Sequence, residues 1–190
     1  MGAIKVHEFT TVDASVGAPM WTMDFAWTEE QTAETAALTA GAGAILLGRA
    51  TYEMFGPAWS QRTVEDDPGA PFFNDTHKYV VSGTLTEPSW GPATVLPYDA
   101  ARIAALKDEV AGDLYVSGSA TLVRALLADG LVDELHLFVH PVLVGSGPYL
   151  APDGGGRTTL SLLGSTTYAN GVVHLTYGPA LPGAEGTRAD

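Results

Sequence analysis

Three short segments combine glycine with hydroxyl side chains directly after an apolar run. They are Gly48-Arg49-Ala50-Thr51, Ser82-Gly83-Thr84 and Gly118-Ser119-Ala120-Thr121. Free N–H groups at the N-terminus of a helix bind phosphate without a lysine, and glycine lets the backbone approach a ligand closely. Arg49 adds a charged donor for one phosphate. The three segments together therefore favour a site for a phosphate-bearing ligand.

Taken singly, each segment is better explained by ordinary structure. Glycine after a strand forms turns, and serine or threonine before a helix caps it. The sequence also contains neither the G-x-G-x-x-G pattern of dinucleotide-binding folds nor the G-x-x-x-x-G-K pattern of P-loops. The argument for a ligand therefore depends on finding the same chemistry at three junctions.

The elements that must position these segments alternate between strand and helix. Apolar or alternating runs predict strands, and the pair Thr28 and Gln31 forms a capping box that begins a helix. The predicted strands cover 4–10, 44–47, 78–82, 93–96, 114–116, 134–144, 158–168 and 171–177, and the predicted helices cover 28–40, 50–55, 99–112 and 120–130, with a long surface loop over 56–76.

This order predicts an α/β fold: a mainly parallel central sheet flanked by helices, with antiparallel strands at the C-terminal end. Ligands of such sheets bind beyond the carboxyl ends of the strands, where all three segments are expected. The length of 190 residues fits one domain, predicted over 1–179, with a flexible tail at 180–190.

Composition excludes several other classes. A formal net charge of -13 argues against nucleic-acid binding, and the absence of cysteine excludes disulfides and thiolate metal sites. No apolar run approaches the roughly 18 residues of a membrane span, and no signal-peptide pattern is present, so a cytoplasmic protein is expected. His136 and His140 lie roughly 13 Å apart along one predicted strand, so one ion cannot bind both. The sequence therefore predicts no metal site.

The motifs resemble those of a known family. Leu47-Gly48-Arg49-x-Thr51-Tyr52-Glu53, Val81-Ser82-x-Thr84-Leu85 and Gly118-Ser119-x-Thr121-Leu122 follow one another in the order found in the reductases that join dihydrofolate reductase to the RibD C-terminal domain of riboflavin biosynthesis. Residues 130–135 and 140–147 continue the pattern. The resemblance covers about 4–178, nearly the whole chain.

The resemblance implies a dihydrofolate reductase-like fold, a homodimer and NADPH as cofactor. It further implies an NAD(P)H-dependent reductase similar to 5-amino-6-(5-phosphoribosylamino)uracil reductase, with hydride transfer to a small heterocyclic or carbonyl substrate. The expected cofactor-binding residues are Val12, Asp13, Gly48, Arg49, Thr51, Ser82, Gly83, Thr84, Gly118, Ser119, Ala120, Thr121 and Leu122. Asp13 and Trp21 are expected near the substrate, and Trp59 is a further candidate for the pocket wall.

The chain departs from the family pattern at several positions. Many relatives carry arginine where Gly83 stands, so NADH remains an alternative to NADPH. Ala14 replaces a family glycine. The nearest candidate for the proton-donating acid is Asp24, with Glu29 and Glu30 as alternatives. A nucleotide-binding protein without catalytic turnover is therefore the second hypothesis.

Overall fold

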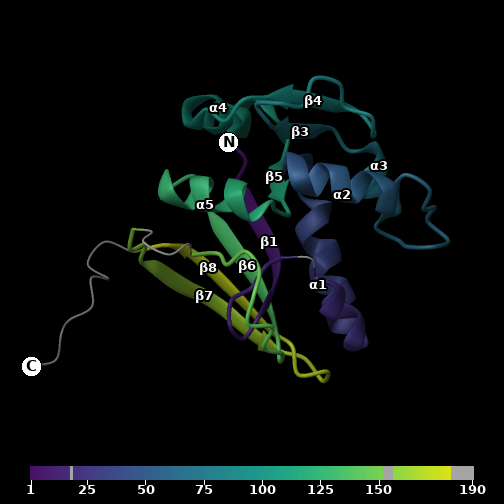
Figure 1. Cartoon of the computed structure of the whole chain (residues 1–190), viewed down its shortest axis with the longest axis vertical. Coiled ribbons are helices and arrows are strands. Elements are labelled where there is room, and N and C mark those ends of the chain that lie inside the picture. The colour runs from purple at the N-terminus through teal and green to yellow at the C-terminus, as the bar shows by residue number, and fades with distance from the viewer. Residues whose placement is uncertain (18, 152–155, 181–190) are drawn as a thin grey trace, which may run out of the picture.

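A single eight-stranded sheet forms the centre of the computed structural model, which describes residues 1–17, 19–151 and 156–180 (Figure 1). The strand order is β4-β3-β2-β5-β1-β6-β8-β7. Strands β4 through β6 in this order run parallel, and β8 and β7 are added antiparallel, as predicted. The bounds are β1 Ile4–Thr11, β2 Ala42–Gly48, β3 Lys78–Val81, β4 Ala93–Leu96, β5 Asp113–Val116, β6 Glu134–His140, β7 Leu160–Thr167 and β8 Val173–Pro179.

Helices cover both faces of the parallel part of the sheet (Figure 1). Helices α4 (Ala100–Glu109) and α5 (Ala120–Ala128) pack on one face, and α1 (Glu29–Ala40), α2 (Arg49–Trp59) and α3 (Ala70–Asp75) lie on the other. A short 3-10 helix, η1, spans Met20–Asp24. In β2, Leu46 joins the core under α4 and α5, whereas Ile45 and Leu47 join the core on the other face. Burial on both faces explains why this strand is continuously apolar.

Side chains cap two of these helices at their N-termini. The Thr28 hydroxyl accepts a hydrogen bond from the Gln31 N–H at 3.2 Å, and the Gln31 side chain accepts one from the Thr28 N–H at 3.2 Å. This is the predicted capping box of α1. Asp99 caps α4 by accepting from the Arg102 N–H at 2.9 Å.

The predicted loop over 56–76 is wrong at both ends. Helix α2 continues through Pro57 to Trp59, and α3 occupies Ala70–Asp75. Phe73 of α3 packs face to face on Trp59 with ring centres 4.2 Å apart. Tertiary packing of aromatic side chains therefore orders a segment whose local sequence favours a loop.

Strand β7, which forms one edge of the sheet, has exposed apolar side chains. Leu162 and Leu163 of β7 each keep 58% of their surface accessible. The predicted homodimer stays a prediction, and residues 181–190 of the predicted tail lie outside the described residues.

Within the described ranges, no helix combines the length and apolar character needed to cross a membrane.

Candidate functional site

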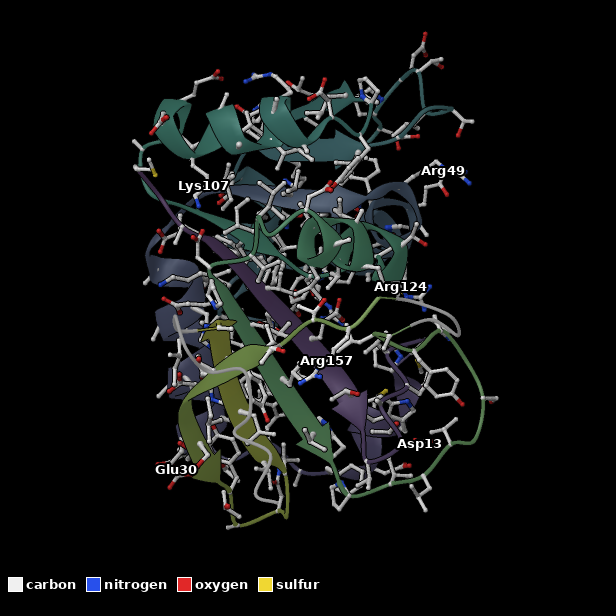
Figure 2. The ribbon with its side chains drawn as sticks, turned by 90° about the vertical axis from the view of Figure 1, so that its left-hand side faces the viewer. Asp13, Glu30, Arg49, Lys107, Arg124 and Arg157 are labelled. Carbon is white, nitrogen blue, oxygen red and sulfur yellow. The ribbon has the colours of Figure 1, made fainter. Side chains whose placement is uncertain are left out.

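The parallel register brings the three glycine-hydroxyl segments together at the carboxyl ends of neighbouring strands. Gly48 at the end of β2 pairs with Val81 of β3, and Leu46 pairs with Val116 of β5. The segment after β2 therefore lies between the segments that follow β3 and β5. In Figure 2 Arg49, Arg124 and Asp13 lie along one side of the molecule, toward which the purple arrow of β1 points.

Two of the segments are in direct contact. The Gly48 N–H donates to the Gly118 carbonyl at 3.1 Å. A Cβ on Gly48 would clash with the Ser119 hydroxyl, and one on Gly118 would lie 2.7 Å from the Thr51 hydroxyl. Gly118 also has a φ of 82°, which disfavours other residues. The contact requires glycine at both positions and sets the starts of α2 and α5 side by side.

Neither of these adjacent helices has a side-chain cap. Gly48 is the N-cap of α2 and Ser119 is the N-cap of α5, and among the described residues no side chain accepts from either first turn as a cap. Helices α1 and α4, by contrast, are capped. Uncapped N–H groups carry the positive end of the helix dipole, so the two starts together form a place for an anion. We call this the glycine cradle: Gly48, Arg49, Thr51, Gly118, Ser119, Ala120, Thr121 and Leu122.

The members of the cradle offer different groups to a ligand. The Leu122 side chain is buried in the core, so only its backbone faces the start of α5. Arg49 pairs with Glu53 one turn along α2, at 3.2 Å between Nη1 and Oε1, with both side chains about half exposed. An exposed pair of this kind contributes little stability, so Arg49 is free to exchange Glu53 for a phosphate.

The segment after β3 forms a turn beside α2. The Ser82 hydroxyl accepts from the Thr84 N–H at 3.1 Å and the Leu85 N–H at 2.9 Å. Gly83 is open: no atom lies within 4 Å of a Cβ built there. Leu85 and Trp90 line an open hollow of about 380 Å³ together with α2. The turn therefore has room for a side chain or a ligand group at position 83.

Hydrogen bonds to the Asp13 carboxylate join the segment after β1 to the segment after β6. Its carboxylate accepts from the Thr11 hydroxyl, from the Gly145 N–H at 2.7 Å and from the Val144 N–H at 3.3 Å. The Thr11 hydroxyl and the Gly145 N–H hold the pKa of Asp13 below its usual value. The neighbouring Val12 is 61% exposed, and its N–H donates to the Val142 carbonyl at 3.0 Å.

This contact corrects the predicted strand over 134–144. Strand β6 ends at His140, and residues 141–147 turn back across the end of β1. Proline at position 141 has no N–H to continue the ladder, so the strand ends there.

Aromatic side chains gather where β6 ends. Trp21 and Phe25 meet His140 edge-on at 4.9 and 5.3 Å between ring centres. The Trp21 Nε1 is buried and has no hydrogen-bond partner among the described residues. Asp24, on the same short helix η1, is exposed. Trp59 belongs to a different aromatic group, stacked on Phe73.

Glu8 is a candidate that the sequence reasoning missed. It is buried in β1, and its Oε1 has no hydrogen-bond partner among the described residues. The same oxygen lies 3.7 Å from a Cβ built on Gly118, directly beneath the glycine cradle. Burial raises the pKa of Glu8 to about 8. The signal in the sequence is an acid inside a strand that is covered on both faces.

The chain is similar to known proteins in sequence and in fold. The chain matches the family described as RibD C-terminal domain over residues 3–174. It is 29% identical over 136 residues to the uncharacterized protein YyaP of Bacillus subtilis, covering 70% of this chain and 72% of that protein.

Solved structures share the fold, and two of them are described here. A putative riboflavin biosynthesis protein from Shewanella sp. PV-4 superimposes with a TM-score of 0.76 at 20% identity, covering 95% of this chain and 100% of that one. Dihydrofolate reductase from Enterococcus faecalis, complexed with NADP(H), gives a TM-score of 0.59 at 14% identity, covering 93% and 96%. The dihydrofolate reductase-like fold, the order of the motifs and the match over 3–174 lead to one conclusion: the chain belongs to the RibD C-terminal domain family.

Proposed function

We propose that this protein is an NAD(P)H-dependent reductase that transfers hydride to a small heterocyclic or carbonyl substrate. The observation that carries the proposal is the glycine cradle, in which two uncapped helix starts meet through Gly48 and Gly118. An anionic dinucleotide fits such a place in an acidic protein, because backbone N–H groups and Arg49 supply the positive charge.

The residues present fit a nicotinamide nucleotide. The first turns of α2 and α5 would hold the phosphates, with Arg49, Thr51 and Ser119 beside them. The turn of Ser82, Gly83 and Thr84 would meet the adenosine side. The bound cofactor supplies the hydride, and the protein supplies orientation and a site shielded from water.

The substrate would lie toward the aromatic side chains at the end of β6. The Trp21 Nε1, which has no partner within the described part of the chain, offers a donor to a substrate oxygen or nitrogen. Asp24 remains the proposed proton donor. Glu8 is a second acid near the cradle, and its raised pKa keeps it protonated at neutral pH, where a carboxylic acid donates a hydrogen bond.

The family suggests a pyrimidine-type substrate, as in the reductase step of riboflavin biosynthesis. A nucleotide-binding protein without turnover is the second candidate. It is favoured by Gly83, which supplies no charge for a ribose phosphate, and by the exposed position of Asp24.

Titration of NADPH and NADH against tryptophan fluorescence tests the binding step. Ala120→Glu places a carboxylate at the first residue of α5, where it complements the helix dipole but repels phosphate. We expect cofactor affinity to fall at least tenfold. Ala100→Glu, the same change at the first residue of α4, is the matched control and leaves cofactor affinity unchanged.

Absence of binding at millimolar cofactor would overturn the proposal. If a cofactor binds, its oxidation is followed across pterins, pyrimidines and small carbonyl compounds. Oxidation with one of them supports a reductase, and binding without any oxidation favours the nucleotide-binding alternative.

A further inference from the structure

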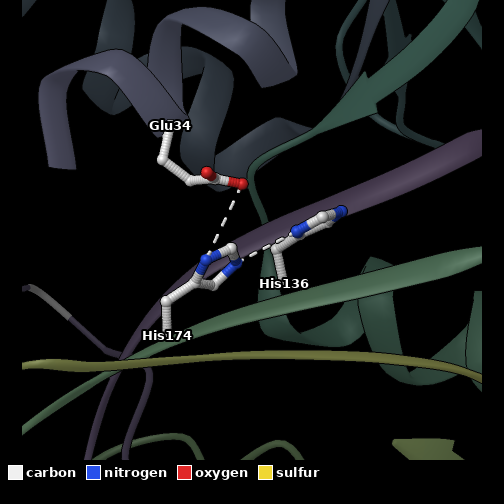
Figure 3. A group of neighbouring side chains, drawn as sticks. All are labelled: Glu34, His136 and His174. Carbon is white, nitrogen blue, oxygen red and sulfur yellow. Dashed lines mark hydrogen bonds and ion pairs between the residues drawn. The ribbon is translucent and has the colours of Figure 1, made fainter. Parts of the chain in front are cut away.

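Three potential metal ligands converge on the sheet face that α1 covers (Figure 3). His136 comes from β6, His174 from β8 and Glu34 from α1. One ligand atom from each lies within 4.8 Å of the other two. The antiparallel register pairs Phe138 with His174 and sets the two histidines diagonally across neighbouring strands. Residues far apart in the sequence thus meet at one point.

The surrounding contacts orient both rings. His136 Nε2 lies 2.9 Å from the Glu134 carboxylate, which places the proton on Nε2 and leaves Nδ1 with its lone pair. A carboxylate that accepts from the far nitrogen is the usual support of a metal-binding histidine. The ring of His174 lies flat on Phe138, with ring centres 4.2 Å apart.

Hydrogen bonding alone leaves this cluster mismatched. His136 Nδ1 lies 3.1 Å from His174 Nε2, and with the His136 proton on Nε2 this contact is a hydrogen bond when His174 donates from Nε2. Its Nδ1 then presents a lone pair to the Glu34 carboxylate at 3.8 Å, so two acceptors face each other.

We propose that Glu34, His136 and His174 bind a divalent transition-metal ion, with Zn²⁺ as the best match. Two imidazoles and a carboxylate are a donor set that Zn²⁺ accepts, with a fourth position left for water. Nitrogens that share a tetrahedral ion at bond lengths of about 2.0–2.1 Å lie about 3.3 Å apart, close to the observed 3.1 Å. The Thr176 hydroxyl lies beside both nitrogens, at 3.3 and 3.4 Å.

Binding requires only local movement. The rings turn so that both lone pairs meet the ion, and the His174 proton shifts from Nε2 to Nδ1, toward the negative charge of Glu34. No proton is released in this tautomer change. The Glu34 side chain is 44% exposed, so its carboxylate is free to approach the ion and the site opens to solvent. The net charge of -13 favours cation entry.

This site is separate from the proposed cofactor site. The glycine cradle lies where β2 and β5 end, whereas the metal site lies under α1 on β6 and β8. An ion held there would tie α1 to the two strands.

The test uses tag-free, chelator-treated protein. Zn²⁺ is titrated by calorimetry and Co²⁺ by its visible absorption, which reports coordination directly. We expect one equivalent to bind, with affinity at least tenfold lower in Glu34→Gln and in His174→Gln. Glu29→Gln on the same helix and His77→Gln elsewhere in the chain are matched controls and leave affinity unchanged.

Circular dichroism verifies that each variant is folded. Glu34→Gln is the decisive variant because its half-exposed side chain is not part of the core. Absence of Zn²⁺ and Co²⁺ binding in the wild type, or wild-type affinity in folded Glu34→Gln, would overturn the proposal.

Discussion

The buried acid Glu8 makes the free energy of unfolding depend on pH in a direction opposite to that of most carboxylates. Its pKa is raised by burial from 4.5 to about 8. Between these values the folded chain keeps a proton that the unfolded chain has lost. The contribution to stability is therefore complete below about pH 4.5 and is lost as pH rises toward 8.

This difference in pKa corresponds to a change of about 5 kcal/mol in the free energy of unfolding between pH 4.5 and 8. Glu8→Gln removes the ionisation while keeping the size of the side chain. We therefore expect the variant to gain stability relative to the wild type as pH rises, with most of the gain between pH 4.5 and about 8.

Urea unfolding followed by tryptophan fluorescence at a series of pH values measures this difference. Comparing variant with wild type cancels groups such as Asp13 and Asp113, whose lowered pKa values act in the opposite direction. Glu87→Gln, at an exposed position, is the control and leaves the pH dependence unchanged. Parallel curves for Glu8→Gln and wild type would refute the argument that burial governs this carboxyl.

Three further substitutions test the turn after β3, the glycine cradle and the cap of α1. Gly83→Arg places a side chain in open space and adds a positive charge beside Ser82. In a fluorescence titration the preference for NADPH over NADH should therefore rise about tenfold. Gly83→Gln, which adds no charge, should leave this preference unchanged. Gly118→Ala places a methyl group 2.7 Å from Thr51 Oγ1 at a φ of 82° and should cost about 1–3 kcal/mol in urea unfolding, against almost nothing for Gly164→Ala in open space. Thr28→Ala removes the α1 cap and should cost about 1 kcal/mol, whereas Thr32→Ala within the same helix should cost clearly less; equal losses would contradict the capping argument.

Local patterns were sufficient to predict much of this fold. The continuously apolar strand β2 and the capping pair Thr28 and Gln31 act through neighbours in the sequence, so both could be recognised without the structure. The meeting of Gly48 and Gly118 follows from parallel topology, because the carboxyl ends of β2 and β5 lie side by side. The role of this contact in cofactor binding stays a proposal.

Other features depend on contacts between distant segments and could not be predicted locally. Helix α3 is short and is held by the stacking of Phe73 on Trp59. The hydrogen bond from the Gly145 N–H to the Asp13 carboxylate joins two loops that are 132 residues apart. The spacing of His136 and His140 along one strand gives no sign of His174, which β8 contributes.

A cradle formed by main-chain groups also bears on how such proteins diverge. The N–H groups of α2 and α5 do not depend on side-chain identity, so steric contact constrains mainly Gly48 and Gly118. Mutation elsewhere around the helix starts can accumulate over evolutionary time without loss of the contact that sets the two helix starts side by side. Lineages would then be free to remodel the aromatic end of the site for new substrates, which is consistent with a shared architecture at only 14–20% identity.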